Sequence, residues 1–224
     1  MEKNGSTTKD RLTMNQNPDH LEVEVKFHLN HPEETLQQLV DLGAVAHSRV
    51  FETNVRFEDA EHNLKANHQL LRLRQDDKCR LTYKCRPRRT QSQCKVFREV
   101  EVEVGDFMAM RDILVEIGYH PVQTYEKWRQ TFHWNEVELC LDTMPYGDFL
   151  EIEGPEKNIK KAARRLGLPW EKRILSNYLA MFEAMRAHYK LPFHDVTFAN
   201  FELHPVDIVP LLENFETQAK AVEG

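Results

Sequence analysis

Acidic and basic side chains recur two residues apart in short segments rich in β-branched residues. Glu22, Glu24 and Lys26 alternate with Val23 and Val25 in the stretch EVEVK. Successive side chains of a β-strand point to opposite faces, so these three charges share one face and the valines share the other. Carboxylates at this spacing can hold a divalent cation, and a lysine beside them can bind a phosphate. The stretch therefore has the residue types for metal-assisted phosphate chemistry.

The same alternation recurs along the chain. The charges that share a face of a predicted strand are Arg72 with Arg74, Lys84 with Arg86, Glu99 with Glu101, Lys127 with Arg129, Glu138 with Asp142, and Glu151 with Glu153. For any one strand, the simplest explanation is a face in contact with water. The strands specialise by sign, however, and like charges on one face repel one another. Taken together, the segments predict a charged interior that binds something between the strands.

A triphosphate bound with a metal ion accounts for both signs of charge. Isolated buried charges cost several kcal/mol each, so an interior lined by them needs partners. Lysine and arginine donate to phosphate oxygens, while Mg²⁺ or Mn²⁺ bridges phosphate oxygens to carboxylates. The basic and acidic faces thus match the two halves of a metal triphosphate.

The elements that would position these faces follow from hydrophobic periodicity. Amphipathic helices would cover the apolar sides of the strands. The order predicts an α+β fold dominated by antiparallel sheet. The expected strands are 20–29, 49–59, 70–75, 79–87, 95–104, 125–134, 137–142 and 148–154, and the expected helices are 31–44, 106–119, 156–167 and 172–189.

Together, these motifs resemble those of a known family. EVEVKF resembles the ExExK signature of the CYTH superfamily, the triphosphate tunnel metalloenzymes, which include class IV adenylate cyclases, thiamine triphosphatases and inorganic triphosphatases. The resemblance covers residues 20–190 and implies an eight-stranded antiparallel β-barrel, a triphosphate tunnel, with helices packed outside. The further motifs, in the family's order, are FETNVRFED, LLRLR, LTYK, REVEVEV, EKWR, LD, GDFLEIEG and SNYLAMF.

The resemblance also implies roles for individual residues, which fall into three groups. The substrate-binding residues would be Lys26, Arg72, Arg74, Lys84, Lys127, Arg129, Glu99, Glu101 and Arg173. The ligands of Mg²⁺ or Mn²⁺ would be Glu22, Glu24, Asp142, Glu151 and Glu153. The catalytic residues would be Glu22, Glu24 and Lys26. Which carboxylate binds which ion stays open, and Glu99 and Glu101 either pair with basic residues or assist a second metal.

The expected function is hydrolysis of an inorganic or organic triphosphate by a metal-dependent phosphohydrolase. One alternative is a class IV-type adenylate cyclase, which needs a nucleoside pocket that the sequence does not identify. The Arg72–Arg74 pair favours the triphosphatase. A second alternative is a non-catalytic module that binds polyphosphate or a nucleotide. Such a module would not need the acidic strands, so their presence favours an enzyme.

Composition bounds the remaining expectations. The net charge of -6 argues against general binding of nucleic acid. No segment reaches the ~20 apolar residues of a membrane-spanning helix, and the first residues lack a signal peptide, so we expect a cytoplasmic protein. We expect it to be a monomer or a homodimer. Histidine spacing does not favour zinc. We expect residues 1–19 to be disordered, 20–190 to form the tunnel domain, and the apolar segment 191–224 to pack on the barrel or a partner subunit.

The aromatic residues of the sixth expected strand are assigned to the exterior of the barrel. Trp128 alternates with Lys127 and Arg129, so it points away from the charged face. We expect Tyr125, Phe132 and Trp134 to cover the outside of the barrel with Trp128.

Overall fold

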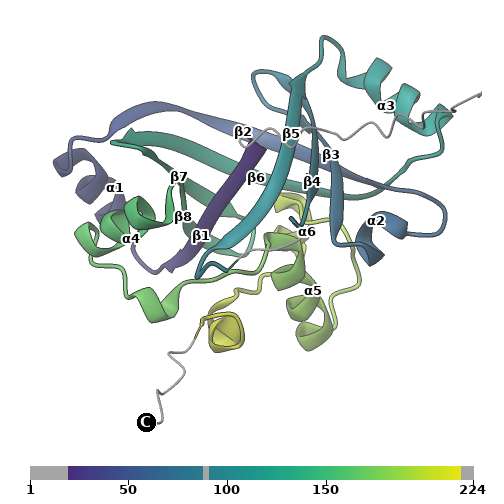
Figure 1. Cartoon of the computed structure of the whole chain (residues 1–224). Helices are drawn as coiled ribbons and strands as arrows, with labels where there is room; N and C mark the ends of the chain where they lie inside the picture. The colour runs from purple at the N-terminus through teal and green to yellow at the C-terminus, as the bar shows by residue number, and fades with distance from the viewer. Residues whose placement is uncertain (1–19, 88–90, 218–224) are drawn as a thin grey trace, which may run out of the picture.

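The computed structural model describes residues 20–87 and 91–217 (Figure 1). The segment 1–19, for which disorder is expected, lies outside the described residues. Eight strands form its centre. They are β1 (Leu21–Leu29), β2 (Val45–Glu58), β3 (Gln69–Gln75), β4 (Cys79–Cys85), β5 (Lys95–Glu103), β6 (His120–Trp134), β7 (Val137–Met144) and β8 (Gly147–Glu153).

The strands close into a barrel in which every neighbouring pair is antiparallel. The order around the barrel is β1-β5-β4-β3-β2-β6-β7-β8, and β8 pairs with β1 to complete it. Most neighbours are also consecutive in the chain, as hairpin connections require. The two exceptions are the connections from β1 to β2 and from β5 to β6. These strands are not neighbours, because β1 lies between β5 and β8 and β2 pairs with β6. The expected eight-stranded antiparallel barrel is confirmed.

Helices surround the barrel, which confirms the α+β class. Figure 1 shows α1 and α4 on one side, α3 on the opposite side, and α5 below the strands. The helices are α1 (Pro32–Asp41), α2 (Asn63–Ala66), α3 (Phe107–Glu116), α4 (Glu156–Arg165), α5 (Tyr178–Tyr189) and α6 (Phe198–Leu203), with short 3-10 helices at Trp170–Lys172 and Val209–Asn214.

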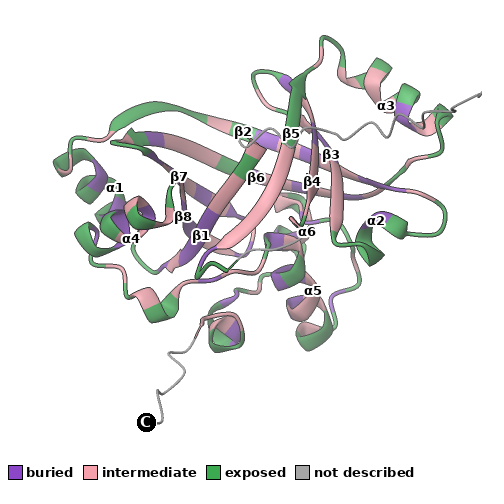
Figure 2. Ribbon diagram, viewed as in Figure 1, coloured by how far each residue is buried: buried purple, intermediate pink, exposed green. Residues whose placement is uncertain are grey.

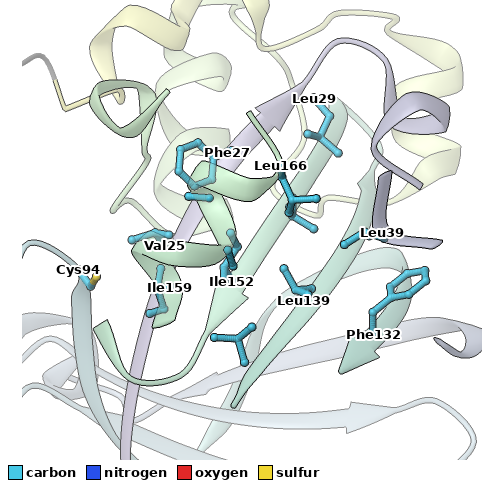
Figure 3. Close-up of a cluster of buried hydrophobic side chains, with 14 residues drawn as sticks. Val25, Phe27, Leu29, Leu39, Cys94, Phe132, Leu139, Ile152, Ile159 and Leu166 are labelled. Carbon is cyan, nitrogen blue, oxygen red and sulfur yellow. The ribbon is translucent and has the colours of Figure 1, made fainter. Parts of the chain in front are cut away.

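The largest apolar layer lies between the outer face of the barrel and the helices α1 and α4. Leu39 of α1 and Ile159 of α4 are fully buried against β1, β7 and β8. Figure 3 shows Val25, Phe27 and Ile152 pointing from their strands into this layer. Both helices carry one buried and one exposed face (Figure 2). The alternation of the strands thus sends apolar residues outward and leaves the charged residues for the interior.

A second apolar layer joins α5 and the segment after it to β7 and β8. Phe182 of α5, Phe201 of α6 and Ile208 pack with Phe149 of β8. The backbone of Val196 bonds to β6 on both sides, with the amide of Val196 donating to Thr124 O at 2.8 Å. Residues 191–217 therefore pack on the barrel and help hold α5 in place.

The last long helix is shorter than expected. It begins at Tyr178 rather than at residue 172 because Ile174 pairs instead with β1. The amide of Lys26 donates to Ile174 O at 3.1 Å, and the amide of Ile174 donates to Lys26 O at 2.8 Å. The register of β1 with β5 ends at Glu24, so Ile174 takes the strand edge that β5 leaves.

Across residues 20–87 and 91–217, none of the helices combines the length and the apolar character that crossing a membrane would require.

Candidate functional site

A cavity of about 510 Å³ lies inside the barrel and collects the charged faces of the strands. Most of the residues predicted from the sequence line it, although they come from six different strands. These are Glu22, Glu24, Lys26, Arg72, Arg74, Lys84, Glu99, Glu101, Lys127, Arg129, Glu151 and Glu153. Two predicted residues, Asp142 and Arg173, do not line the cavity.

Lys26 lies deep in the cavity between two carboxylates. Its ammonium is 3.0 Å from Glu24 Oε1 and 2.7 Å from Glu151 Oε1, and the side chain is 2% exposed. Burial alone would lower the pKa of Lys26, but Glu151 and Glu24 raise it above its ordinary value. Burial opposes the ionisation of Glu24 too, yet Lys26 and Lys95 lower its pKa below the usual range. Lys26 and Glu24 therefore carry their charges at neutral pH.

Asp142 lies behind the cavity lining and binds two of the cations that line the cavity, Lys127 and Arg129. Its carboxylate accepts hydrogen bonds from Lys127 Nζ at 2.9 Å, Arg129 Nε at 2.6 Å and the Tyr178 hydroxyl at 2.9 Å. The residue is fully buried. The resemblance implies a metal ligand here, but the structure places the carboxylate against two cations and a phenol. Asp142 thus orients Lys127 and Arg129.

Arg173 is the second predicted residue that lies elsewhere. Its guanidinium donates to Gln93 O at 2.9 Å and to Trp170 O at 2.8 Å, and it stacks on the Trp170 ring. The neighbouring Ile174 bonds to β1 and buries its side chain in the α5 layer. Alternation along this extended segment then turns Arg173 outward, away from the substrate-binding position expected of it.

A buried carboxylate on β2 lies among the cations of the cavity and was not predicted from the sequence. Glu52 is 1% exposed and lies 3.3 Å from Arg74 Nη1 and 3.6 Å from Lys127 Nζ. Although burial opposes it, the nearby cations Lys127, Arg74 and Arg129 lower the pKa of Glu52 below its usual range. The signal was present, since Glu52 and Asn54 share one face of the stretch FETNV.

Lys95 is a further cavity residue that sequence reasoning missed. It is the first residue of β5 and forms an ion pair with Glu24. Burial lowers the pKa of Lys95, and Glu24 opposes that change. Because Lys26 also pairs with Glu24, two lysines share this one carboxylate. Its position at the strand end, where alternation is hardest to assign, explains why it was missed.

Tyr125 is on the inside of the barrel, so the expectation that it covers the exterior is wrong. The Arg72 guanidinium donates to its hydroxyl at 3.2 Å, and Tyr125 lines the cavity. Its sequence parity is that of Lys127. Trp128 has the opposite parity and lies outside, 38% exposed and edge-on to Phe51.

The outward assignment of the other two aromatic residues agrees with the structure. Phe132 is fully buried in the layer under α1 and α4, and Trp134 packs against the same layer.

The amino-terminal end of α5 forms part of the cavity wall. Asn177 caps the helix by accepting a bond from the Ala180 amide at 2.7 Å, and both residues line the cavity. The Tyr178 ring lies 5.0 Å from Lys26 Nζ and 5.4 Å from Lys127 Nζ, within the range of cation–π attraction. Tyr178 therefore contacts both lysines and the Asp142 carboxylate at once.

Carboxylates of like charge face one another on the opposite wall. Glu153 is directly across from Glu24 on one side and from Glu138 on the other, a repulsive arrangement. Burial, together with the charges of Glu22 and Glu138, raises the pKa of Glu153 to about 8. Among the described residues no lysine, arginine or histidine lies within ion-pair distance of Glu153.

Glu22 is the second carboxylate with a raised pKa. Lys84 Nζ lies 2.5 Å from Glu22 Oε2 and 2.6 Å from Glu99 Oε2, so two carboxylates share one lysine. Burial raises the pKa of Glu22 to about 7 with the help of Glu24 and Glu99, although Lys84 opposes the shift. Together with Glu153, this wall has more carboxyl groups than the nearby lysines pair with, so Glu22 and Glu153 retain protons at a higher pH than an ordinary glutamate does.

The donor set on this wall fits a divalent cation. Glu22, Glu138 and Glu153 supply oxygen ligands of the kind that Mg²⁺ and Mn²⁺ prefer, and a cation would remove the repulsion between them. In the part of the chain that the structure describes, no group of three or more carboxylate, histidine or cysteine side chains is arranged to hold a metal ion by itself. A cation at this wall would therefore need phosphate oxygens or water among its ligands.

Comparison with known proteins identifies the fold and the family. Residues 20–168 match the family model of the CYTH domain. A protein of Methanocaldococcus jannaschii, named as a candidate adenylate cyclase, is 27% identical over 135 residues, which cover 59% of this chain and 76% of that protein. The PH1012 protein of Pyrococcus horikoshii OT3 shares 29% identity with a TM-score of 0.60, over 70% of this chain and 96% of that structure.

A plant protein has the same fold at lower identity. It is a candidate adenylyl cyclase from Hippeastrum, described as having a dominant triphosphatase activity. It is 19% identical to this chain, with a TM-score of 0.54, over 74% of this chain and 95% of that structure. The family model covers more than half of the sequence and includes all eight strands. The chain therefore belongs to the CYTH family.

Proposed function

We propose that the protein is a divalent-metal-dependent triphosphatase that binds its substrate inside the barrel. One observation carries the proposal: the cavity has a basic wall and, facing it, a wall of carboxyl groups in which Glu153 has no cationic partner among the described residues and a pKa raised to about 8. A triphosphate binds to the first and a cation to the second. The two together neutralise a cavity that neither would neutralise alone.

The basic wall positions the phosphates. Lys26, Lys127 and Arg129 are held by the buried carboxylates Asp142 and Glu151, so their donors are oriented before the substrate arrives. Preorganised donors stabilise charge that develops on a leaving phosphate more effectively than mobile ones. Arg72, Arg74 and Lys84 extend the same surface, as the sequence predicts.

The carboxylate wall is the proposed metal site. Glu22, Glu138 and Glu153 would hold Mg²⁺ or Mn²⁺, with phosphate oxygens completing the coordination shell. The bound ion would supply charge neutralisation and orientation of the phosphates. Glu24 and Glu151 stay closer to Lys26 in this arrangement, so of the predicted ligands Glu22 and Glu153 are the ones we assign to the ion.

Formation of cyclic AMP from ATP is the second candidate activity. It is supported by the names of relatives, and the cavity offers apolar lining from Leu70, Phe97 and Leu179 that could contact a nucleoside. The Hippeastrum protein supports the triphosphatase reading of the shared fold. We favour hydrolysis because the cavity has enough basic side chains to bind a triphosphate, whereas we assign no side chain in it to the selection of adenine.

The test is a turnover assay with purified protein. Inorganic triphosphate, ATP and thiamine triphosphate are each incubated with Mg²⁺ or Mn²⁺, and phosphate release and cyclic AMP are measured separately. We expect phosphate release that stops on addition of EDTA. Cyclic AMP as the main product would favour the cyclase, and binding without turnover of any of the three would favour a binding module.

Matched variants link the activity to the cavity. Glu153→Gln removes a carboxylate from the proposed metal site, and Glu103→Gln makes the same change on the surface of β5, where Glu103 pairs with Lys78. We expect the first variant to need a higher metal concentration and the second to behave like wild type.

A further inference from the structure

Arg56 on β2 is an unusual basic residue of the cavity. It lines the cavity, its Nε atom is buried without a hydrogen-bond partner, and no carboxylate of the described residues lies within ion-pair distance of it. The deeper cations Lys26, Lys127 and Arg129 each contact at least one carboxylate. A half-buried guanidinium without partners indicates that an anion outside the protein binds there.

The strand register sharpens this point. Arg56 lies directly across from Arg72 in the β2–β3 pair, and the Nε atom of Arg72 is likewise buried and unpartnered. Arg72 is 6% exposed and uses its other nitrogens to bond Tyr125 and Thr82. Like charges opposite one another destabilise a sheet. An anion between the two guanidinium groups would satisfy both Nε donors and remove that repulsion.

Two more cations border the same part of the cavity. Lys65 of α2 and Arg86, which follows β4, are both exposed and line the cavity with Arg56. Neither has an ion-pair partner among the residues that the structure describes. The three side chains together define a basic rim, which consists of Arg56, Lys65 and Arg86. In Figure 1, α2 lies beside β3.

The basic rim is separate from the deep cations along the strand. Glu52 of β2 is across from Lys127, whereas Arg56 is four residues further on and across from Gln123. Four residues of a strand span about 13 Å, so the backbone of Arg56 lies well beyond that of Glu52 and Lys127 along the barrel interior. A phosphate chain whose first phosphates contact Lys127 and Lys26 extends toward Arg56 as it becomes longer.

We propose that the basic rim binds a fourth phosphate, so that the cavity selects chains of four or more phosphates over triphosphate. This inference rests on the proposed function for the orientation of the chain. Arg56 is the specificity-determining residue, and Lys65 and Arg86 add attraction at the rim. Arginine suits the role because its planar fork binds two phosphate oxygens at once.

Binding in the presence of EDTA tests the inference without turnover. Inorganic triphosphate and tetraphosphate are titrated into wild type and Arg56→Gln by isothermal calorimetry. We expect wild type to bind tetraphosphate about tenfold more tightly than triphosphate, the effect of one added charge-assisted contact. Arg56→Gln should lose most of that preference and bind triphosphate about as well as wild type does.

Arg49→Gln is the matched control. Arg49 is on the same strand, but it is exposed, contacts Thr143 and stacks on Trp128 outside the barrel. We expect this variant to keep the wild-type preference. Melting temperatures check the fold, and Arg56→Gln should melt at or above wild type because it removes the repulsion with Arg72.

The outcomes separate this inference from the proposed function. An unchanged preference in Arg56→Gln, or an equal loss for both ligands, would overturn the fourth-phosphate site. Absence of phosphate release in the turnover assay would instead overturn the triphosphatase and leave the binding ratio readable. A parallel titration with ATP and adenosine tetraphosphate identifies the source: the preference extends to nucleotides if it recurs there, and belongs to inorganic chains if it does not.

Discussion

The Tyr178 hydroxyl donates a hydrogen bond to Asp142 Oδ2 across 2.9 Å, joining α5 to the base of the cavity. The family model ends at residue 168, so this contact reaches the barrel from outside the matched region. The same tyrosine ring lies beside Lys26 and Lys127. The helix is therefore part of the site, because it fixes the carboxylate and the lysines that the phosphates would meet.

Tyr178→Phe tests that contact by removing only the hydroxyl. Loss of a buried hydrogen bond to a charged group costs ~1.5–3 kcal/mol, which corresponds to a melting temperature lower by roughly 3–10 °C for a chain of this size. We also expect kcat to fall several-fold while KM changes less, because Lys127 loses a fixed neighbour. Tyr189→Phe is the control, since its hydroxyl bonds Asp207 O near the surface and has no other partner among the described residues. Equal melting temperatures for both variants would contradict the positioning role.

Asp142→Asn should destabilise the protein more strongly. The change leaves Lys127 and Arg129 with one buried negative charge fewer, and breaking such a buried set costs ~3–5 kcal/mol. Urea denaturation measures the free energy of unfolding. Asp112→Asn on the exposed side of α3 serves for comparison and should change it by less than about 0.5 kcal/mol. Similar unfolding curves for the two variants would argue against Asp142 as a structural support.

Lys26→Ala and Glu24→Gln should abolish turnover while the barrel stays folded. Removing a preorganised charge from such a site typically costs ~10²-fold or more in rate. Lys78→Ala, which breaks a surface ion pair with Glu103, controls for the loss of a lysine. Steady-state phosphate release gives the rates, and circular dichroism verifies the fold. Near-normal release by either folded cavity variant would refute the assignment.

Stability should depend on pH through the carboxylate wall. The pKa values of Glu22 and Glu153 are raised to about 7 and about 8, above their unfolded values. The folded state then holds protons that the unfolded state has released, so these groups make the metal-free protein less stable as pH rises from about 4.5 to about 8. Melting curves across this range measure the effect.

Divalent metal should oppose that trend. A cation at the wall favours the ionised carboxylates, so the stabilisation by Mg²⁺ should increase with pH over the same range. Glu153→Gln should flatten both the pH dependence and the metal effect, while Glu103→Gln should leave them unchanged. A metal effect that is independent of pH, or one that persists in Glu153→Gln, would place the ion elsewhere.

Truncation after Lys190 should destabilise the protein. It removes Val196, Phe201 and Ile208 from the layer that packs on α5 and β8, along with the backbone bonds between Val196 and β6. Burial of each such side chain contributes ~1.5–3 kcal/mol, so the melting temperature should fall by more than about 10 °C. Melting curves and mass measurement by light scattering provide the test. An unaltered melting temperature and an unaltered mass would show that the segment contributes neither stability nor assembly.

The strand faces were predictable from the sequence because alternation has a period of two. Once Glu24 and Lys26 are assigned to one face, the remaining charges of the strand follow without knowledge of its partners. The same alternation puts Trp128 on the outside of the barrel. Tyr125 is two residues from Lys127, so alternation puts it on the inside with Lys127, where the structure has it. Strand ends were harder, and Lys95 was missed at one of them.

Pairing among the charges was not predictable. Asp142 and Glu153 are both carboxylates on inward faces, yet the first is saturated by two cations and a phenol while the second faces Glu24 and Glu138. The difference depends on which strands become neighbours and in which register. No local pattern contains that information, because the contacts join residues far apart in the chain.

By itself, the sequence determined the α+β class and the charged faces of the strands, since these depend on residue type and alternation, and it led to the hypothesis of a bound triphosphate with a metal ion. The tertiary structure decided that α5 and Tyr178 close on the lysines, that Asp142 supports cations, and that Arg173 turns outward. It also placed Arg56 opposite Arg72 without a carboxylate partner among the described residues. These outcomes depend on closure of the barrel and on strand register, which bring together charges that the chain keeps apart.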